Sequence, residues 1–233
     1  MSPQKDLTPL EKTLGVSFKD QDVLRQALVH RSYLNENPGF HLSHNERLEF
    51  LGDAVLELVV TDHLYHHYAL PEGELTNLRA AIVRGEMLSK IAEELALDDF
   101  LLLSRGERKD TGKARQYILA NAVEAVIGAL YLDQGYGAAA ELINRLIVAK
   151  LHDIVEQGLH IDTKSKFQEL AQEKYRITPT YTVLREDGLD HAKHFVIGVF
   201  LGKKKLGEGT GSSKQEAQQQ AAKEALDQLE KEA

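Results

Sequence analysis

The stretch HNERLEFLGDAVLEL, residues 44–58, decides how the first part of the chain folds. It contains no proline, and apolar side chains recur in it at the spacing of one helix face. We expect a helix that continues to about Tyr68. The residues expected to face a core are Leu48, Leu51, Val55 and Leu58.

Four acidic residues form a second stripe on the same helix, at steps of three and four: Glu46, Glu49, Asp53 and Glu57. Carboxylates at this spacing are neighbours on a helix surface and repel one another. A row of acids is most often a solvated helix face, and spacing alone favours that interpretation. The alternative is a site for a hard cation such as Mg²⁺, which takes oxygen ligands.

Residue identity favours the cation site. The nine residues NERLEFLGD, 45–53, are identical to the signature stretch of bacterial ribonuclease III, which the chain therefore resembles. A second stretch, YILANAVEAVIGALY at 117–131, resembles the second motif of that family, although Asn121 stands where the family usually has Asp. The resemblance implies an endonuclease for double-stranded RNA that depends on Mg²⁺, with Mn²⁺ able to substitute.

Charge is distributed unevenly along the 233 residues. The whole chain has 28 Lys and Arg against 36 Asp and Glu; residues 1–159 hold 16 against 24, and residues 160–233 hold 12 of each. An acidic balance opposes a protein that simply coats nucleic acid, and it fits a metal enzyme with a separate RNA-binding module. The absence of Cys excludes disulfides and Cys-based zinc sites.

The chain shows neither an apolar segment of signal-peptide length at its start nor a run long enough to span a membrane. We therefore expect a cytoplasmic protein without a membrane partner.

The pattern of elements predicts two domains. An all-α endonuclease domain of the ribonuclease III type is expected at 1–156, a linker at 157–162, and an α-β-β-β-α double-stranded RNA-binding domain at 163–233. The expected elements of the second domain are a helix at 163–175, strands at 180–185, 193–201 and 204–209, and a helix at 212–231. In the first domain, we expect Thr8 and Thr76 to cap helices and one last helix over about 138–155.

The resemblance assigns Glu49, Asp53, Asn121 and Glu124 to a metal-centred site, with Asp53 and Glu124 as catalytic residues. Independently, Glu124 lies in an apolar helix, where a buried unpaired carboxylate is costly and a cation is a natural partner. Asp53 acts either as a ligand or through a water molecule. Glu46 and Glu72 are expected in a second acidic ring, and the alternative for Glu72 is a loop acid in water.

Further candidates follow from the same resemblance. Phe50 lies toward the acidic side of its helix, in the region that forms the dimer contact of the family, so we expect a twofold homodimer. The residues expected to bind duplex RNA by its shape are Gln168, Glu169, His191, Ser212, Ser213 and Lys214. The basic loop at 104–116 either meets phosphates or is simply solvated. His63 and His67 have the spacing of a zinc pair but no third ligand at a sensible spacing, which argues against that metal.

The sequence is compatible with three functions. The first is an endoribonuclease that leaves 5′-phosphate and 3′-hydroxyl ends, with ribosomal precursors and some messenger and transfer RNAs as the family's usual substrates. The second is a nuclease-impaired protein that only binds duplex RNA, and the third is a phosphohydrolase for small molecules with an unrelated helical fold. The retained Glu49, Asp53 and Glu124 oppose the second, and the RNA-binding module opposes the third.

Overall fold

A computed structural model describes residues 5–158, 162–188 and 193–231. Contacts divide the chain into two compact units, Met1–His160 and Ile161–Ala233. Within the described ranges, none of the helices has the length and apolar character needed to cross a membrane.

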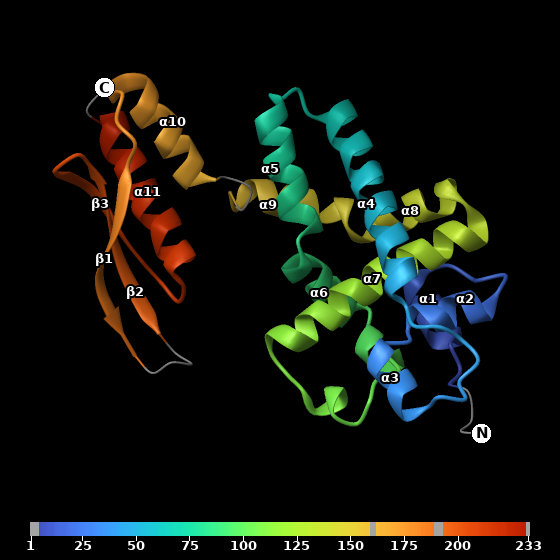
Figure 1. The fold of residues 1–233 in the computed structure, drawn as a ribbon. Helices are drawn as coiled ribbons and strands as arrows, with labels where there is room; N and C mark the ends of the chain where they lie inside the picture. Colours follow the sequence, from blue (N-terminus) through green and yellow to red (C-terminus); the bar gives the residue numbers. More distant parts are fainter. Residues whose placement is uncertain (1–4, 159–161, 189–192, 232–233) are drawn as a thin grey trace. The chain divides into compact units, whose positions relative to one another are not determined.

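The first unit is helical and is built around the pair α4 and α7, with α5 beside α4 (Figure 1). Its elements are α1 (Thr8–Leu14), α2 (Gln21–Ala27), α3 (Arg31–Glu36), α4 (Glu46–His67), α5 (Glu72–Val83), α6 (Gly85–Glu94), η1 (Leu97–Phe100), η2 (Glu107–Lys109), α7 (Lys113–Gln134), α8 (Tyr136–Leu146), η3 (Val148–Lys150) and α9 (Leu151–Glu156). The core includes the fully buried Leu56, Leu64, Leu78, Ile82 and Leu130. Each such side chain contributes about 1.5–3 kcal/mol through burial.

Two glycines allow α4 and α7 to touch at the backbone. A Cβ atom built on Gly52 would lie 1.7 Å from the backbone oxygen of Glu124, and one built on Gly128 would lie 2.2 Å from the backbone oxygen of Leu48. Carbon atoms cannot approach oxygen so closely, so only glycine fits at either position. The rest of the unit packs around a crossing that these two residues fix.

The long helix agrees with the sequence, but the prediction that Leu58 faces the core is wrong. Leu48 and Val55 are buried, Leu51 is half-buried, and Leu58 is 57% exposed. The buried stripe instead continues through Leu56, Val59, Val60 and Leu64, because α4 is covered on more than one side in its second half. Leu58 lies on the open side that also carries Phe50.

Several predicted helix boundaries also differ. Thr8 does not cap α1; its backbone N–H and its hydroxyl both donate to the carboxylate of Asp6. Thr76 lies inside α5, which begins at Glu72 after Pro71. The last helix expected over 138–155 is broken into α8, η3 and α9.

The second unit has the predicted α-β-β-β-α order. Its elements are α10 (Thr163–Tyr175), β1 (Thr180–Asp187), β2 (His194–Leu201), β3 (Lys204–Gly211) and α11 (Lys214–Lys231). The strands form an antiparallel sheet in the order β1-β2-β3 (Figure 1). Phe167 of α10, Val199 of β2 and Ala221 of α11 are fully buried together between helices and sheet.

Alternate residues of β3 are glycines where α11 passes close to the strand. A Cβ atom on Gly209 would lie 2.2 Å from the backbone oxygen of Ala217, and one on Gly207 would lie 2.4 Å from that of Ala221. The alanines of α11 complete this close helix-on-strand packing. The GEGTG sequence and the Ala-rich helix are therefore two sides of one contact.

The glycine contact between α4 and α7 can be tested by adding one methyl group. Gly52→Ala is expected to lower the free energy of unfolding by about 1–3 kcal/mol or more, because the helices must move apart to accommodate the new Cβ. Gly137→Ala is the control, since that glycine is also helical but a Cβ there meets nothing within 4 Å. Denaturation in urea measures both, and equal stability of the two variants would contradict the proposed role of the contact.

Candidate active site

The predicted metal residues lie on the two helices that the glycine contact joins. Glu49 and Asp53 belong to α4, on either side of Gly52, while Asn121 and Glu124 belong to α7. The backbone of Glu124 is the group closest to Gly52. Glu49, Asn121 and Glu124 are half-buried, and Asp53 is exposed.

The carboxylates of this site act on one another electrostatically. Burial, followed by the charges of Asp53 and Glu49, raises the pKa of Glu124 to about 7. Burial also raises the pKa of Glu49, followed by the charge of Glu46, while a hydrogen bond from Asn121 lowers it. Asp53 and Glu124 therefore share one electrostatic environment, although they lie 71 positions apart in the sequence.

The donor set is chemically suited to a hard cation. Carboxylate and amide oxygens are the ligands that Mg²⁺ prefers, and a divalent charge would offset the repulsion that raises the pKa of Glu49 and Glu124. Within the described ranges, no three His, Cys, Asp or Glu side chains are grouped closely enough to hold a metal ion by themselves. Mg²⁺ does not need such a group, because it usually binds one or two carboxylates and keeps several water molecules.

Glu46 begins α4, one turn before Glu49, and has cationic neighbours of its own. Its carboxylate lies 3.8 Å from the Arg31 guanidinium of α3 and 3.7 Å from His44 Nδ1, which is charged when that ring is protonated. The spacing of the acidic stripe does not reveal either neighbour, because Arg31 belongs to another helix and His44 precedes α4. The charge of Glu46 is therefore partly balanced within the chain.

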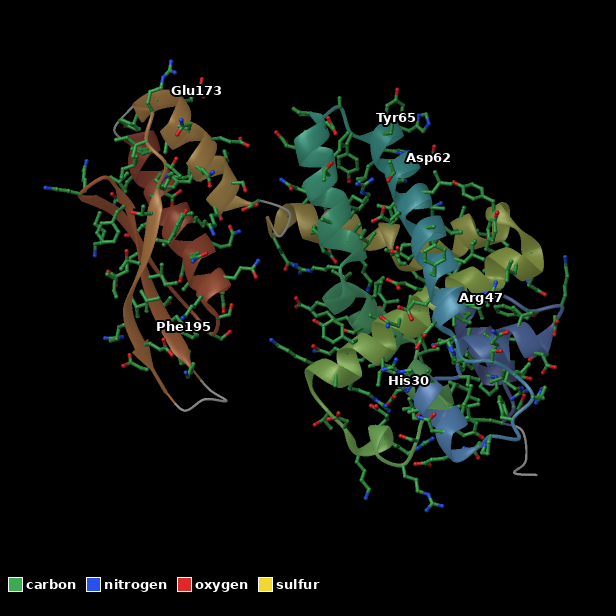
Figure 2. The ribbon with its side chains drawn as sticks, in the orientation of Figure 1. His30, Arg47, Asp62, Tyr65, Glu173 and Phe195 are labelled. Atoms are coloured by element: carbon green, nitrogen blue, oxygen red, sulfur yellow. The ribbon has the colours of Figure 1, made fainter. Side chains whose placement is uncertain are left out.

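Glu72 is not brought to this cluster within one chain. It begins α5, close to the far end of α4 from Glu46, and lines a shallow hollow with Thr61, Tyr65 and Arg79. Figure 2 shows Arg47 and Tyr65 well apart along α4. The first residue of α4 that lines this hollow, Thr61, lies about 12 Å along the helix axis from Asp53, so the hollow is separate from the acidic cluster.

Phe50 is 81% exposed on the outer side of α4. It borders a hollow that Gln26, Arg47, Leu51 and Leu132 also line. Leu132 is 60% exposed and Leu58 is 57% exposed, so the apolar surface extends beyond one ring. This set of exposed apolar residues, Phe50, Leu58 and Leu132, is called the apolar face below.

The RNA-binding candidates of α10 are accessible. Gln168 and Glu169 are exposed and line a shallow groove with Ser165, Gln172 and Arg176. The groove thus presents two amides, one hydroxyl and one guanidinium beside the carboxylates of Glu169 and Glu173, and all of these groups can hydrogen-bond ribose hydroxyls. His191 lies outside the described residues.

The two serines at the start of α11, which were expected to bind phosphate, are hydrogen-bonded within the chain. The backbone N–H and the hydroxyl of Ser212 both donate to the Glu216 carboxylate, and the Glu216 N–H donates to the Ser213 hydroxyl. These hydrogen bonds lower the pKa of Glu216. Lys214 is exposed, and its Nζ lies 5.5 Å from the centre of the Phe195 ring.

One of the five basic residues of the loop at 104–116 forms an ion pair within the first unit. Arg115 pairs with Asp98, whereas Arg105, Arg108, Lys109 and Lys113 are exposed. The side chains of these four residues are available to an anionic ligand.

Comparisons with known proteins agree with this architecture. The family model described as Ribonuclease-III-like matches residues 20–151, and the model of the double-stranded RNA binding motif matches residues 163–229. The chain belongs to the ribonuclease III family. It is 44% identical to Ribonuclease 3 of Dehalococcoides mccartyi over 226 residues, which is 97% of this chain and 95% of that protein. It is 46% identical to Ribonuclease 3 of Oceanobacillus iheyensis over 225 residues, covering 96% and 98% of the two chains.

A solved structure extends the likeness to the first unit. The nuclease domain of ribonuclease III from Campylobacter jejuni is 43% identical, has a TM-score of 0.56, and covers 62% of this chain and 97% of its own. The predicted family, the predicted two-part fold class and the assignment as an endoribonuclease are confirmed. The phosphohydrolase of unrelated fold is excluded.

The raised pKa of Glu124 has a consequence for the stability of this ribonuclease III. Because the pKa is about 7 in the folded chain and near 4.5 when unfolded, stability is lost as pH rises from about 4.5 through 7 and the folded carboxyl ionises. Glu124→Gln removes this ionisation. In EDTA the variant is expected to unfold at a similar temperature to the wild type at pH 5 and to be more stable by about 1–2 kcal/mol at pH 8, allowing for solvent screening.

Glu141→Gln makes the same charge change at an exposed position of α8 and serves as the control. Thermal unfolding at both pH values measures the effect. The opposite result is a wild-type protein that becomes more stable relative to Glu124→Gln between pH 5 and pH 8. It would show that burial and like charge do not raise the pKa of Glu124.

Proposed function

We propose that this chain is a Mg²⁺-dependent endoribonuclease that hydrolyses double-stranded RNA and leaves 5′-phosphate and 3′-hydroxyl ends. The proposal rests on one observation. Glu49 and Asp53 of α4 interact with Asn121 and Glu124 of α7, in a chain that also matches the double-stranded RNA binding motif. Mn²⁺ is proposed to substitute for Mg²⁺. Ribosomal precursors and some messenger and transfer RNAs are the proposed substrates, in the cytoplasm.

The site residues divide the work by their chemistry. Bound Mg²⁺ would supply an activated water molecule and would neutralise charge on the leaving oxygen. Glu49, Glu124 and the Asn121 side-chain oxygen are proposed to hold the ion. Asp53, which is exposed beside them, is proposed to orient water at the edge of the site. Glu46 and Glu72 are proposed as outer acids, with Glu72 serving the partner subunit's site.

Asn121 distinguishes this site from the family's usual pattern. Its side-chain oxygen has the position and the lone pairs of an Asp oxygen, so it can still ligate Mg²⁺ or orient a bound water. It contributes no charge, and its amide group hydrogen-bonds the Glu49 carboxylate. We therefore propose an active enzyme that needs more Mg²⁺ than an Asp-containing relative, and not a nuclease-impaired binding protein.

Duplex binding is proposed to rest mainly on the second unit, residues 163–233. Gln168 and Glu169 would contact ribose hydroxyls in one minor groove, and the loop around His191 would reach another. Lys214 would hold a phosphate, with Ser212 and Ser213 nearby. Because Glu216 engages both serines, Lys214 carries most of the proposed phosphate affinity at this helix start.

A homodimer is proposed to form through the apolar face. The comparison structure from Campylobacter jejuni is described as having a flexible region involved in dimer formation of its nuclease domain. In this chain, the 81% exposure of Phe50 beside a hollow fits an aromatic anchor that inserts into a second copy. A twofold arrangement would provide one site for each strand of a duplex.

The cleavage proposal is tested with labelled duplex RNA. The wild type is expected to cut with Mg²⁺ and not with EDTA, and Glu124→Gln is expected to bind the duplex but not to cut it. Asn121→Asp is expected to keep or raise activity and to lower the Mg²⁺ concentration for half-maximal rate severalfold, because it adds a charged ligand. If only Asn121→Asp cuts at saturating Mg²⁺ or Mn²⁺, the chain as written is a binding protein with an impaired nuclease.

The dimer proposal is tested by sedimentation at micromolar concentrations. Phe50→Ala is expected to weaken association by about 2–4 kcal/mol, since truncating a buried interface aromatic removes most of its contact. Ile177→Ala is the control, because Ile177 is an exposed apolar residue of the second unit. A wild-type chain that sediments as a monomer, or equal association of both variants, would refute the assigned interface.

A further inference from the structure

One side of α7 becomes more exposed toward the N-terminus of the helix. Along it, Lys113 and Tyr117 are exposed, whereas Asn121 and Glu124 are half-buried in the site. The steps of four, four and three residues place all four on one side of the helix. Tyr117 is therefore the first residue of this stripe outside the acidic cluster.

Tyr117 is unusual for an aromatic residue of a helix that is otherwise largely buried, because its side chain is 67% exposed. Its hydroxyl makes no hydrogen bond to any residue that the structure describes. Packing within this unit therefore gives no reason for a tyrosine here. The rise of a helix puts Tyr117 about 6 Å from Asn121 and about 10 Å from Glu124 along the axis.

Two kinds of ligand contact can be told apart on this stripe. The carboxylates of Glu49, Asp53 and Glu124 repel phosphate oxygens, and the positive charge that can meet a phosphate belongs to Lys113 and not to the phenol of Tyr117. A phenol both donates and accepts a hydrogen bond, as does a ribose 2′-hydroxyl. A-form RNA displays its 2′-hydroxyls along the shallow minor groove, where an exposed side chain can reach them.

We infer that the Tyr117 hydroxyl binds the 2′-hydroxyl of a nucleotide next to the scissile phosphodiester, on the strand that is cut. This inference rests on the proposed endonuclease function and adds a substrate-binding residue to the first unit. Tyr117 fixes the cut strand relative to the site and favours RNA over DNA at that nucleotide. It takes no part in the bond cleavage itself.

The test pairs a protein change with an RNA change. A duplex with a single cleavage site carries a 2′-deoxy nucleotide at one position at a time around the scissile bond, and kcat/KM is measured for wild type and Tyr117→Phe. At one position, the deoxy substitution is expected to slow the wild type about two- to tenfold and to leave Tyr117→Phe unchanged. Tyr117→Phe alone should show the same two- to tenfold loss on the all-ribose duplex.

Tyr136→Phe is the matched control, because Tyr136 is an exposed tyrosine beyond the opposite end of α7. It is expected to keep the wild-type response to every deoxy position. If the wild type cuts but the effects of Tyr117→Phe and of each deoxy nucleotide simply multiply, the assignment of Tyr117 is wrong and the proposed function stands. If the wild type does not cut at all, the proposed function is wrong and this assignment falls with it.

Discussion

The backbone contact between α4 and α7 at Gly52 and Gly128 is the constraint on which the site depends. Each site residue lies within two turns of one of these glycines, so the spacing of the helix axes sets the spacing of the carboxylates. A larger side chain at either glycine would separate Glu49 and Asp53 from Glu124. The contact therefore serves packing and chemistry together, and neither can change without the other.

This arrangement stores electrostatic repulsion in the folded chain. Glu124 is the most affected residue, because burial removes water from its carboxyl while Asp53 and Glu49 add like charge. A solvated helix face would not show this, since water would screen its acids. The repulsion is tolerated because a continuous aliphatic core surrounds α4 and α7, and it is the physical reason why we propose a cation at this site.

Local patterns predicted the long elements well, because periodicity reports on burial in α4, α7 and α10, while β-branched and aromatic residues indicated the strands even though burial does not alternate along β1 or β2. They failed for Leu58, since spacing on one helix cannot say which of its sides a neighbouring helix covers. The pairing of Asp53 with Glu124 came from family resemblance, because residues so far apart share no local pattern. The role of Gly52 escaped prediction for the same reason: its partner is the backbone of another helix.

The second unit matches the double-stranded RNA binding motif although residues 160–233 hold equal numbers of basic and acidic side chains, and the contacts at the start of α11 show how two of these charges are placed. The Ser213 hydroxyl caps α11 by accepting a hydrogen bond from the Glu216 N–H, and the Glu216 carboxylate accepts one from the Ser212 N–H, so a negative charge lies beside the N-terminus of this helix. Lys214 counters it, held near the Phe195 ring. Since counterion release scales with the phosphates that a protein neutralises, we expect hydroxyls and amides that follow A-form shape to contribute to the proposed duplex binding.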